Sequence, residues 1–152
     1  MKAHGAVVEA VREHRLDDVA ELVKSDPRTV RQLVALTYRP EPDVRAAAAR
    51  GLALAGHHHP RLVQEVARRL VWAMNEESGT NAVNAPEVLR AVAEETPELL
   101  RPLVPNLLRL TRDARLRDAL VDVVRLVAQG DRRSVVNSIA RAIVNCQKGK
   151  SS

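Results

Sequence analysis

Three consecutive histidines, His57-His58-His59, are the first residues whose type suggests chemistry, because imidazole is a common metal ligand. Successive residues of a helix point about 100° apart, so the three rings cannot share one ion while the chain is helical. The sequence offers no cysteine nearby and no second histidine cluster to complete a tetrahedral zinc site. We therefore expect the histidines to lie at the C-terminus of a helix, with no bound metal or cofactor.

Residue patterns that serve catalysis are absent from the sequence. It contains no glycine-rich phosphate loop, no Gly-x-Ser-x-Gly and no Cys-His-Asn pattern. The adjacent carboxylates of Glu76 and Glu77 seldom point at one substrate. The only cysteine, Cys146, follows Ile139 and Ile143 at helical spacing, which predicts a place in the core. We therefore expect a protein that is not an enzyme.

The basic residues are concentrated in the C-terminal third of the chain. Residues 1–100 hold 13 Lys or Arg and 15 Asp or Glu, a net charge of −2, whereas residues 101–152 hold 11 and 4, a net charge of +7. Such asymmetry is typical of proteins with an anionic partner, although acidic residues three or four positions away can pair with some of these arginines. The candidate phosphate-binding residues are Arg109, Arg112, Arg115, Arg117, Arg132 and Arg133.

The composition fits one globular domain. The 152 residues are 45% hydrophobic and 28% charged, enough to bury a core. No stretch approaches the roughly 20 uninterrupted apolar residues of a membrane span, and the start carries charges where a signal peptide needs an apolar segment. We therefore expect a cytoplasmic protein with a single domain over residues 1–147 and a short basic and polar tail over residues 148–152.

Helical starts recur at nearly constant spacing along the chain. Pro27, Pro60, Pro97 and Asp131 open apolar helical patterns and are separated by 33, 37 and 34 residues. Proline suits the first helical turn, and aspartate suits an N-cap. Periods of this length are typical of stacked helix pairs. The sequence therefore predicts an all-α protein of about nine helices.

Each unit divides into two helices. Pro42 and Asp43 restart a helix that Gly56 can close, and residues 4–25 predict a shorter helix pair broken near Arg15.

In the last third, the helix from Pro97 contains Pro102 and Pro105, which remove backbone donors, so it should kink or begin late. The next helix is expected to end at Gly130, and residues 131–147 to form a separate closing helix.

The stretches EPDVRAAAARGLALAG and PELLRPLVPNLLRLTRDARLRDALVDVVRLVA resemble HEAT-like repeats. A proline-containing first helix, an aspartate turn and a Val-Arg or Leu-Arg opening of the second helix recur in them, here at Asp43-Val44-Arg45 and at Asp113 with Leu116-Arg117. The resemblance covers roughly residues 27–147. It implies a right-handed α-α superhelix, or armadillo-like solenoid, in which the second helices line the concave side.

The polar stretch MNEESGTNAVNAPE interrupts the second unit. Asn84 can cap the helix that holds Pro86 in its first turn, and loops that interrupt repeats often carry binding. The alternative is an insertion that packs on its own helices. Together with Trp72, residues 75–79 and 85–87 are similar to a block in uncharacterised prokaryotic HEAT-like proteins, with Val83 where a larger aromatic is expected.

Trp72, the only tryptophan, lies off the apolar face of the helix from Pro60. That face consists of Leu62, Val63, Val66, Leu70, Ala73 and Met74. The ring is either covered by the 75–85 loop or available to a partner, and we expect it to be covered.

Two functions are consistent with these patterns. The leading hypothesis is a scaffold that binds another protein through its concave face and the 75–85 loop. Its candidate partner-binding residues are Trp72, Asn75, Glu76, Glu77, Ser78, Asn81 and Asn84. The alternative is nucleic-acid binding through the arginine-rich C-terminal units.

Overall fold

The computed structural model describes residues 2–76 and 84–150, and all regular secondary structure in this part is helical. This part contains no strand, so the prediction of an all-α protein is confirmed. None of its helices is both long enough and apolar enough to cross a lipid bilayer. The α-helices are α1 (Lys2–Arg12), α2 (Leu16–Ser25), α3 (Thr29–Leu36), α4 (Pro42–Ala55), α5 (Pro60–Asn75), α6 (Ala85–Glu95), α7 (Val104–Leu110) and α8 (Arg117–Lys150).

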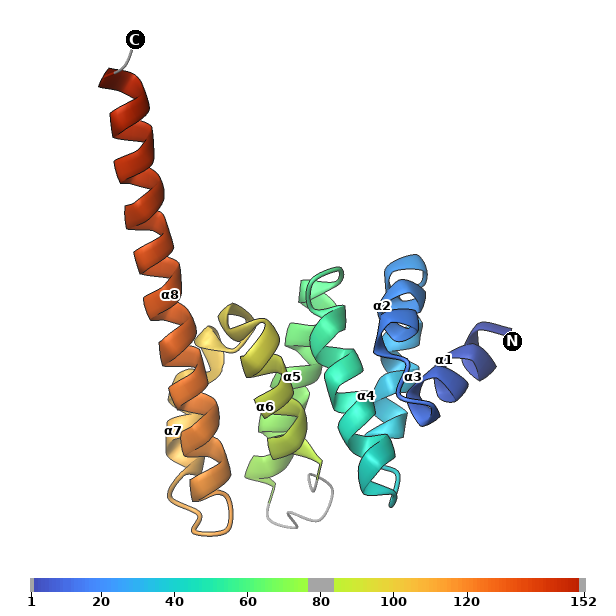
Figure 1. Cartoon of the computed structure of the whole chain (residues 1–152). Helices are drawn as coiled ribbons and strands as arrows, with labels where there is room; N and C mark the ends of the chain where they lie inside the picture. Colours follow the sequence, from blue (N-terminus) through green and yellow to red (C-terminus); the bar gives the residue numbers. More distant parts are fainter. Residues whose placement is uncertain (1, 77–83, 151–152) are drawn as a thin grey trace.

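The helices follow one another along the molecule in two rows (Figure 1). One row is formed by α2, α4, α6 and α8, each in contact with the next; the other is formed by α1, α3, α5 and α7. Contacts are extensive from α4 to α6 and from α6 to α8, whereas α5 touches α3 and α7 only sparsely. The row that contains α3 and α5 is therefore the more open of the two.

Small side chains explain the close packing around α4. Ala48, Ala53 and Ala55 of this helix are fully buried. At Gly51 an added Cβ would lie 3.0 Å from Cγ1 of Val19 and 3.1 Å from Cδ2 of Leu33. Because small residues let helix axes approach closely, α4 packs against α2 and α3 without an aromatic side chain in the contact.

Several boundaries that the sequence predicts are confirmed. α1 and α2 are separated near Arg15, after His14 with φ of 57°, and α4 begins at Pro42 and ends next to Gly56. After Pro97 the chain forms two 3-10 helices, η2 (Pro97–Leu99) and η3 (Arg101–Leu103), so α7 begins late, as expected from the prolines.

The predicted end of a helix at Gly130 and the separate helix over residues 131–147 are wrong. α8 is one helix of 34 residues that continues to Lys150, into the expected tail. Gly130 allows a close contact instead: an added Cβ would lie 2.4 Å from Cγ and 2.8 Å from Cβ of Pro97. The missing side chain therefore lets α8 pack directly on η2.

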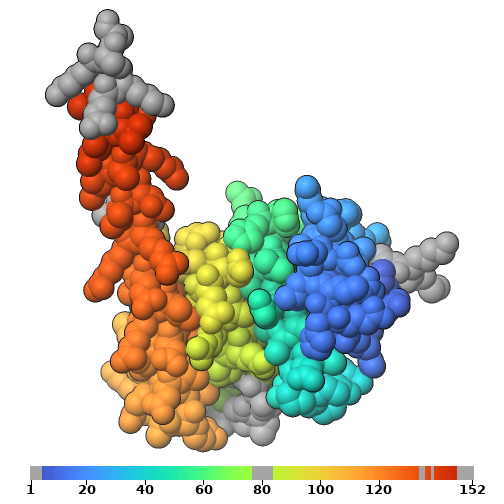
Figure 2. Space-filling model, in the orientation of Figure 1, coloured from blue at the N-terminus to red at the C-terminus, as the bar shows by residue number. Residues whose placement is uncertain are grey.

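The second half of α8 extends away from the other helices (Figure 2). Its apolar residues Val136, Ile139 and Ile143 are 62%, 55% and 54% exposed, and Cys146 is exposed as well. The expectation that Cys146 belongs to the core is therefore wrong, because none of the other described helices packs against this part of α8.

Asn84 precedes α6 but its side chain does not cap that helix. Its Nδ2 donates a hydrogen bond of 2.7 Å to Oγ1 of Thr37, the residue that follows α3, and both side chains are buried. The Thr37 hydroxyl in turn donates to the carbonyl oxygen of Val34 at 2.6 Å. This pair therefore joins the end of α3 to the start of α6.

Replacing Thr37 with valine is expected to destabilise the fold by about 1–1.5 kcal/mol, since it leaves the buried amide of Asn84 without its partner. Thermal unfolding followed by circular dichroism measures the change. Thr111→Val is the matched control: Thr111 also donates to a carbonyl three residues earlier, that of Leu108, but at an exposed position. Equal losses in both variants would contradict a structural role for the Asn84 contact.

Candidate functional site

An apolar groove of about 900 Å³ opens between α3 and α5. It lies where the contacts between neighbouring helices of one row are sparse. Its apolar walls come from both helices, with Val30 and Val34 on α3 and Val66 and Leu70 on α5. The groove is therefore a consequence of the spacing between two helices that belong to different sequence units.

Three large apolar side chains line this groove and remain exposed. Tyr38 is 56% exposed, Leu62 45% and Trp72 67%. The expectation that Trp72 is covered is wrong, although its place off the buried face of α5 is confirmed. Exposed aromatic and aliphatic side chains gathered at one groove are typical of a binding surface.

Two neighbouring stripes on α5 explain why this helix serves both the core and the groove. Its buried side chains are Val63, Ala67, Leu70, Val71 and Met74. A second stripe at helical spacing contains Leu62, Val66, Ala73 and, beside them, Trp72. Leu62 was expected in the core, but it belongs to this second stripe.

The charged residues of the groove are mainly cationic. Arg28, Arg31 and Arg69 line it together with a single acid, Glu65. Nε of Arg69 lies 3.5 Å from Oε1 of Glu65. Arg28 is held by Asp26, whose carboxylate accepts bonds from the side chain and the backbone of Arg28. These bonds keep the pKa of Asp26 below its ordinary value. Two of the three arginines are therefore paired with an acid, and the rim carries a small excess of positive charge next to an apolar floor.

The predicted partner-binding residues have different places in the structure. Trp72 lines the groove, whereas Asn75 ends α5 and donates to the carbonyl oxygen of Val71 at 3.2 Å. Glu76 is the exposed residue that follows. Asn84 is buried against Thr37, which makes its role structural. Residues Glu77, Ser78 and Asn81 lie outside the described residues.

Sequence reasoning missed the other groove residues. Tyr38 is the only tyrosine, and it lies two residues after the end of α3. A lone aromatic residue just after a helix was the signal that could have identified it. Leu62 belongs to the second stripe of α5, which merges with the core face on a helical wheel. No pattern within the sequence of either helix predicts that α3 and α5 lie next to each other.

The six candidate phosphate-binding arginines do not form one stripe. Four lie around the turn between α7 and α8, and three of these have local partners: Arg109 donates to Asn106, Arg115 to Asp113 and Arg117 to the carbonyl oxygen of Thr111. Arg115 also keeps the pKa of Asp113 below its usual value through side-chain and backbone hydrogen bonds.

Arg132 and Arg133, the other two candidates, are exposed near the middle of α8. They lie 15 or more residues after Arg117, about 22 Å along the helix. The structure therefore separates them from the other four.

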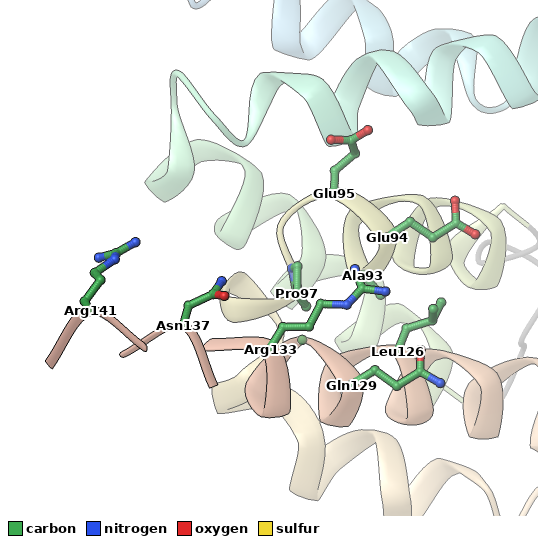
Figure 3. Close-up of a pocket in the computed structure, with 10 residues that line it drawn as sticks. Ala93, Glu94, Glu95, Pro97, Leu126, Gln129, Arg133, Asn137 and Arg141 are labelled. Atoms are coloured by element: carbon green, nitrogen blue, oxygen red, sulfur yellow. The ribbon is translucent and has the colours of Figure 1, made fainter. Parts of the chain in front are cut away.

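A second, polar cleft of about 520 Å³ lies between α8 and the end of α6 (Figure 3). Arg133, Asn137 and Arg141 line it from α8, and Glu94 and Glu95 from α6. In Figure 3 the two guanidinium groups lie apart and the two carboxylates point in different directions. The charged groups therefore do not converge on one ligand position.

The histidines make separate contacts at the end of α4. Nε2 of His57 lies 3.1 Å from a carboxylate oxygen of Glu95, and Nε2 of His59 lies 2.8 Å from the carbonyl oxygen of Val23. In the described ranges, no three His, Cys, Asp or Glu side chains are grouped so that they could hold a metal ion. These contacts join α4 to α6 and α2.

Comparison with known proteins gives no family: no family model, curated protein or solved structure matches this chain.

Proposed function

We propose that this protein is a non-catalytic HEAT-like repeat scaffold whose groove between α3 and α5 binds an amphipathic helix of another protein. The observation that carries the proposal is the shared exposure of Tyr38, Leu62 and Trp72 on one groove. The two rows of helices and the repeated spacing of helical starts support the repeat solenoid.

The shape of the groove favours a helix as the bound element. It is bounded by two helices, and α5 alone is 16 residues long, about 24 Å. A helix that lies in such a groove inserts side chains from positions i, i+3, i+4 and i+7 between its walls. Aromatic residues are the usual anchors of such contacts, and Trp72 and Tyr38 supply two.

The charge of the groove sets the second property of the partner. Three arginines and one glutamate line it, so acidic residues beside the apolar face of the bound helix are favoured. This proposal moves the binding surface from the expected concave face to the more open row of helices. Among the partner-binding residues predicted from the sequence, Trp72 remains part of the proposed site.

Selection from a library of displayed helical peptides against the full chain tests the proposal. We expect peptides with apolar residues at helical spacing and flanking Asp or Glu, and we expect Leu62→Glu to abolish their binding by placing a charge on the apolar wall. Leu108→Glu is the matched control, because Leu108 is 52% exposed on α7 and does not line the groove. Peptides that bind both variants equally would refute the groove as the site.

A further inference from the structure

The exposed half of α8 carries an apolar stripe with coiled-coil spacing. Val136, Ile139, Ile143 and Cys146, called here the α8 stripe, are separated by three, four and three residues, and all four are exposed. This is the spacing of the a and d positions in a heptad repeat. At 100° per residue the stripe lies about 150° from the side on which Leu120, Val123 and Val127 are buried, so it faces away from the rest of the molecule.

We propose that a second copy of this chain docks on the α8 stripe, with the two α8 helices antiparallel. The distribution of charge favours this occupant. Between residues 134 and 147 the only charged residue is Arg141, and it lines the polar cleft on the other side of the helix (Figure 3). A stripe without charge neither repels its own copy nor selects an oppositely charged helix.

Small residues beside the stripe allow two helices to approach. Ala140 and Ala142 occupy the positions that flank Ile139 and Ile143 on the two sides of the stripe. In most coiled coils these flanking positions carry charges that select a partner, whereas alanine leaves them neutral and small. The pair would therefore be held by its apolar contacts alone.

The antiparallel orientation follows from the charges that precede the stripe. At the same heptad spacing the stripe continues to Arg132 and Arg125 toward the N-terminus and to Lys150 toward the C-terminus, and Lys150 too would meet its own copy in a parallel pair. A parallel pair would place each of these arginines opposite its own copy, and like charges at such positions are destabilising. An antiparallel pair centred near residue 141 places Val136 opposite Cys146 and Ile139 opposite Ile143, and it keeps Arg125 outside the contact. It places position 132 opposite position 150 at each end, so two pairs of like charges face each other, against three in the parallel pair.

The groove between α3 and α5 of another copy is a poor alternative binding site for the α8 stripe. The groove has Arg28, Arg31 and Arg69 on its rim, and α8 brings Arg132 and Arg133 next to its stripe. Such a contact would join two cationic surfaces.

The pair is expected to be weak. Two heptads form a contact at the small end of protein interfaces, below the roughly 1,200–2,000 Å² of a standard one. The first half of α8 packs on η2, α6 and α7, so the helix is already formed before it pairs. We therefore expect a dissociation constant on the order of tens of micromolar for the dimer, which is typical of a weak reversible interaction.

Sedimentation equilibrium of the full chain from about 5 to 500 µM, a range that brackets this constant, tests the proposal. The average mass is expected to rise from 16.7 kDa toward twice that value. Ile139→Glu/Ile143→Glu should keep the protein monomeric, whereas the matched control Asn137→Glu/Asn145→Glu, which adds the same charge on other sides of the helix, should dimerise as the wild type does. A wild-type monomer at the highest concentration, or a dimer that survives the stripe variant, would overturn the proposal.

Crosslinking with a short bismaleimide tests the orientation. In the antiparallel pair the two Cys146 side chains are about 15 Å apart along the helices, so the wild-type chain should not crosslink. Val136→Cys should produce a covalent dimer, since that position faces Cys146 of the second copy. A wild-type dimer crosslinked through Cys146 would instead show parallel helices and contradict the proposed arrangement.

Discussion

Replacing Gly130 with alanine is expected to lower the free energy of unfolding by about 2 kcal/mol, because the new Cβ would lie 2.4 Å from Cγ of Pro97. The proline ring is rigid and belongs to η2, so α8 or η2 must shift. Overpacking of this kind costs about 1–3 kcal/mol, and a clash this close belongs at the upper end of that range. The higher helix propensity of alanine offsets up to about 1 kcal/mol of this loss.

Urea unfolding followed by far-ultraviolet circular dichroism measures this change. Gly5→Ala is the matched control, since Gly5 also lies within a helix but nothing lies within 4 Å of its added Cβ. That variant should be as stable as the wild type or more stable by up to about 1 kcal/mol. If Gly130→Ala were equally stable, the contact between α8 and Pro97 would not be as close as described.

The two glycines that predicted helix ends illustrate a limit of sequence reasoning. Gly56 does follow α4, but its φ of −59° is an ordinary helical value, and an added Cβ would lie 2.8 Å from Oγ1 of Thr96. Gly130 does not end a helix at all. Both glycines pack against the segment from Thr96 to Leu99, which lies between α4 and α8. The sequence shows only a glycine in both cases, so it does not distinguish a glycine required for close packing from one required at a helix end.

The order of the helices could be predicted, but the free surfaces could not. Proline and aspartate starts located α4, α5 and α6 because capping and the first turn depend on neighbouring residues. The exposure of Ile139 and Cys146 depends on the absence of a packing partner on α8, and an apolar stripe has the same pattern whether or not it is covered.

The groove shows the same limit at the candidate site. Trp72 could be placed off the buried face of α5 from periodicity alone. Whether its ring was covered depended on the distance between α3 and α5, and this distance is set by the contacts of α3 with α4 and of α5 with α4 and α6. Sequence reasoning therefore identified one residue of the site without identifying the site.

Replacing Trp72 with alanine is expected to weaken the binding of groove-selected peptides about 30-fold, which corresponds to about 2 kcal/mol for loss of an aromatic anchor. The ring is 67% exposed in the free protein, so its removal should change the free energy of unfolding by no more than about 0.5 kcal/mol. A large effect on binding with little effect on stability distinguishes a binding residue from a core residue.

The same tryptophan provides the measurement, because it is the only one in the chain. A bound apolar helix should remove water from the indole and shift its fluorescence emission to shorter wavelength, and a titration then gives the dissociation constant of the wild type. Calorimetric titration gives that constant for Trp72→Ala, which lacks the probe, and for Trp72→Phe, which keeps an aromatic ring and should retain part of the affinity. Peptides that bind Trp72→Ala as tightly as the wild type, or that leave the emission unchanged while bound, would place their site elsewhere on the protein.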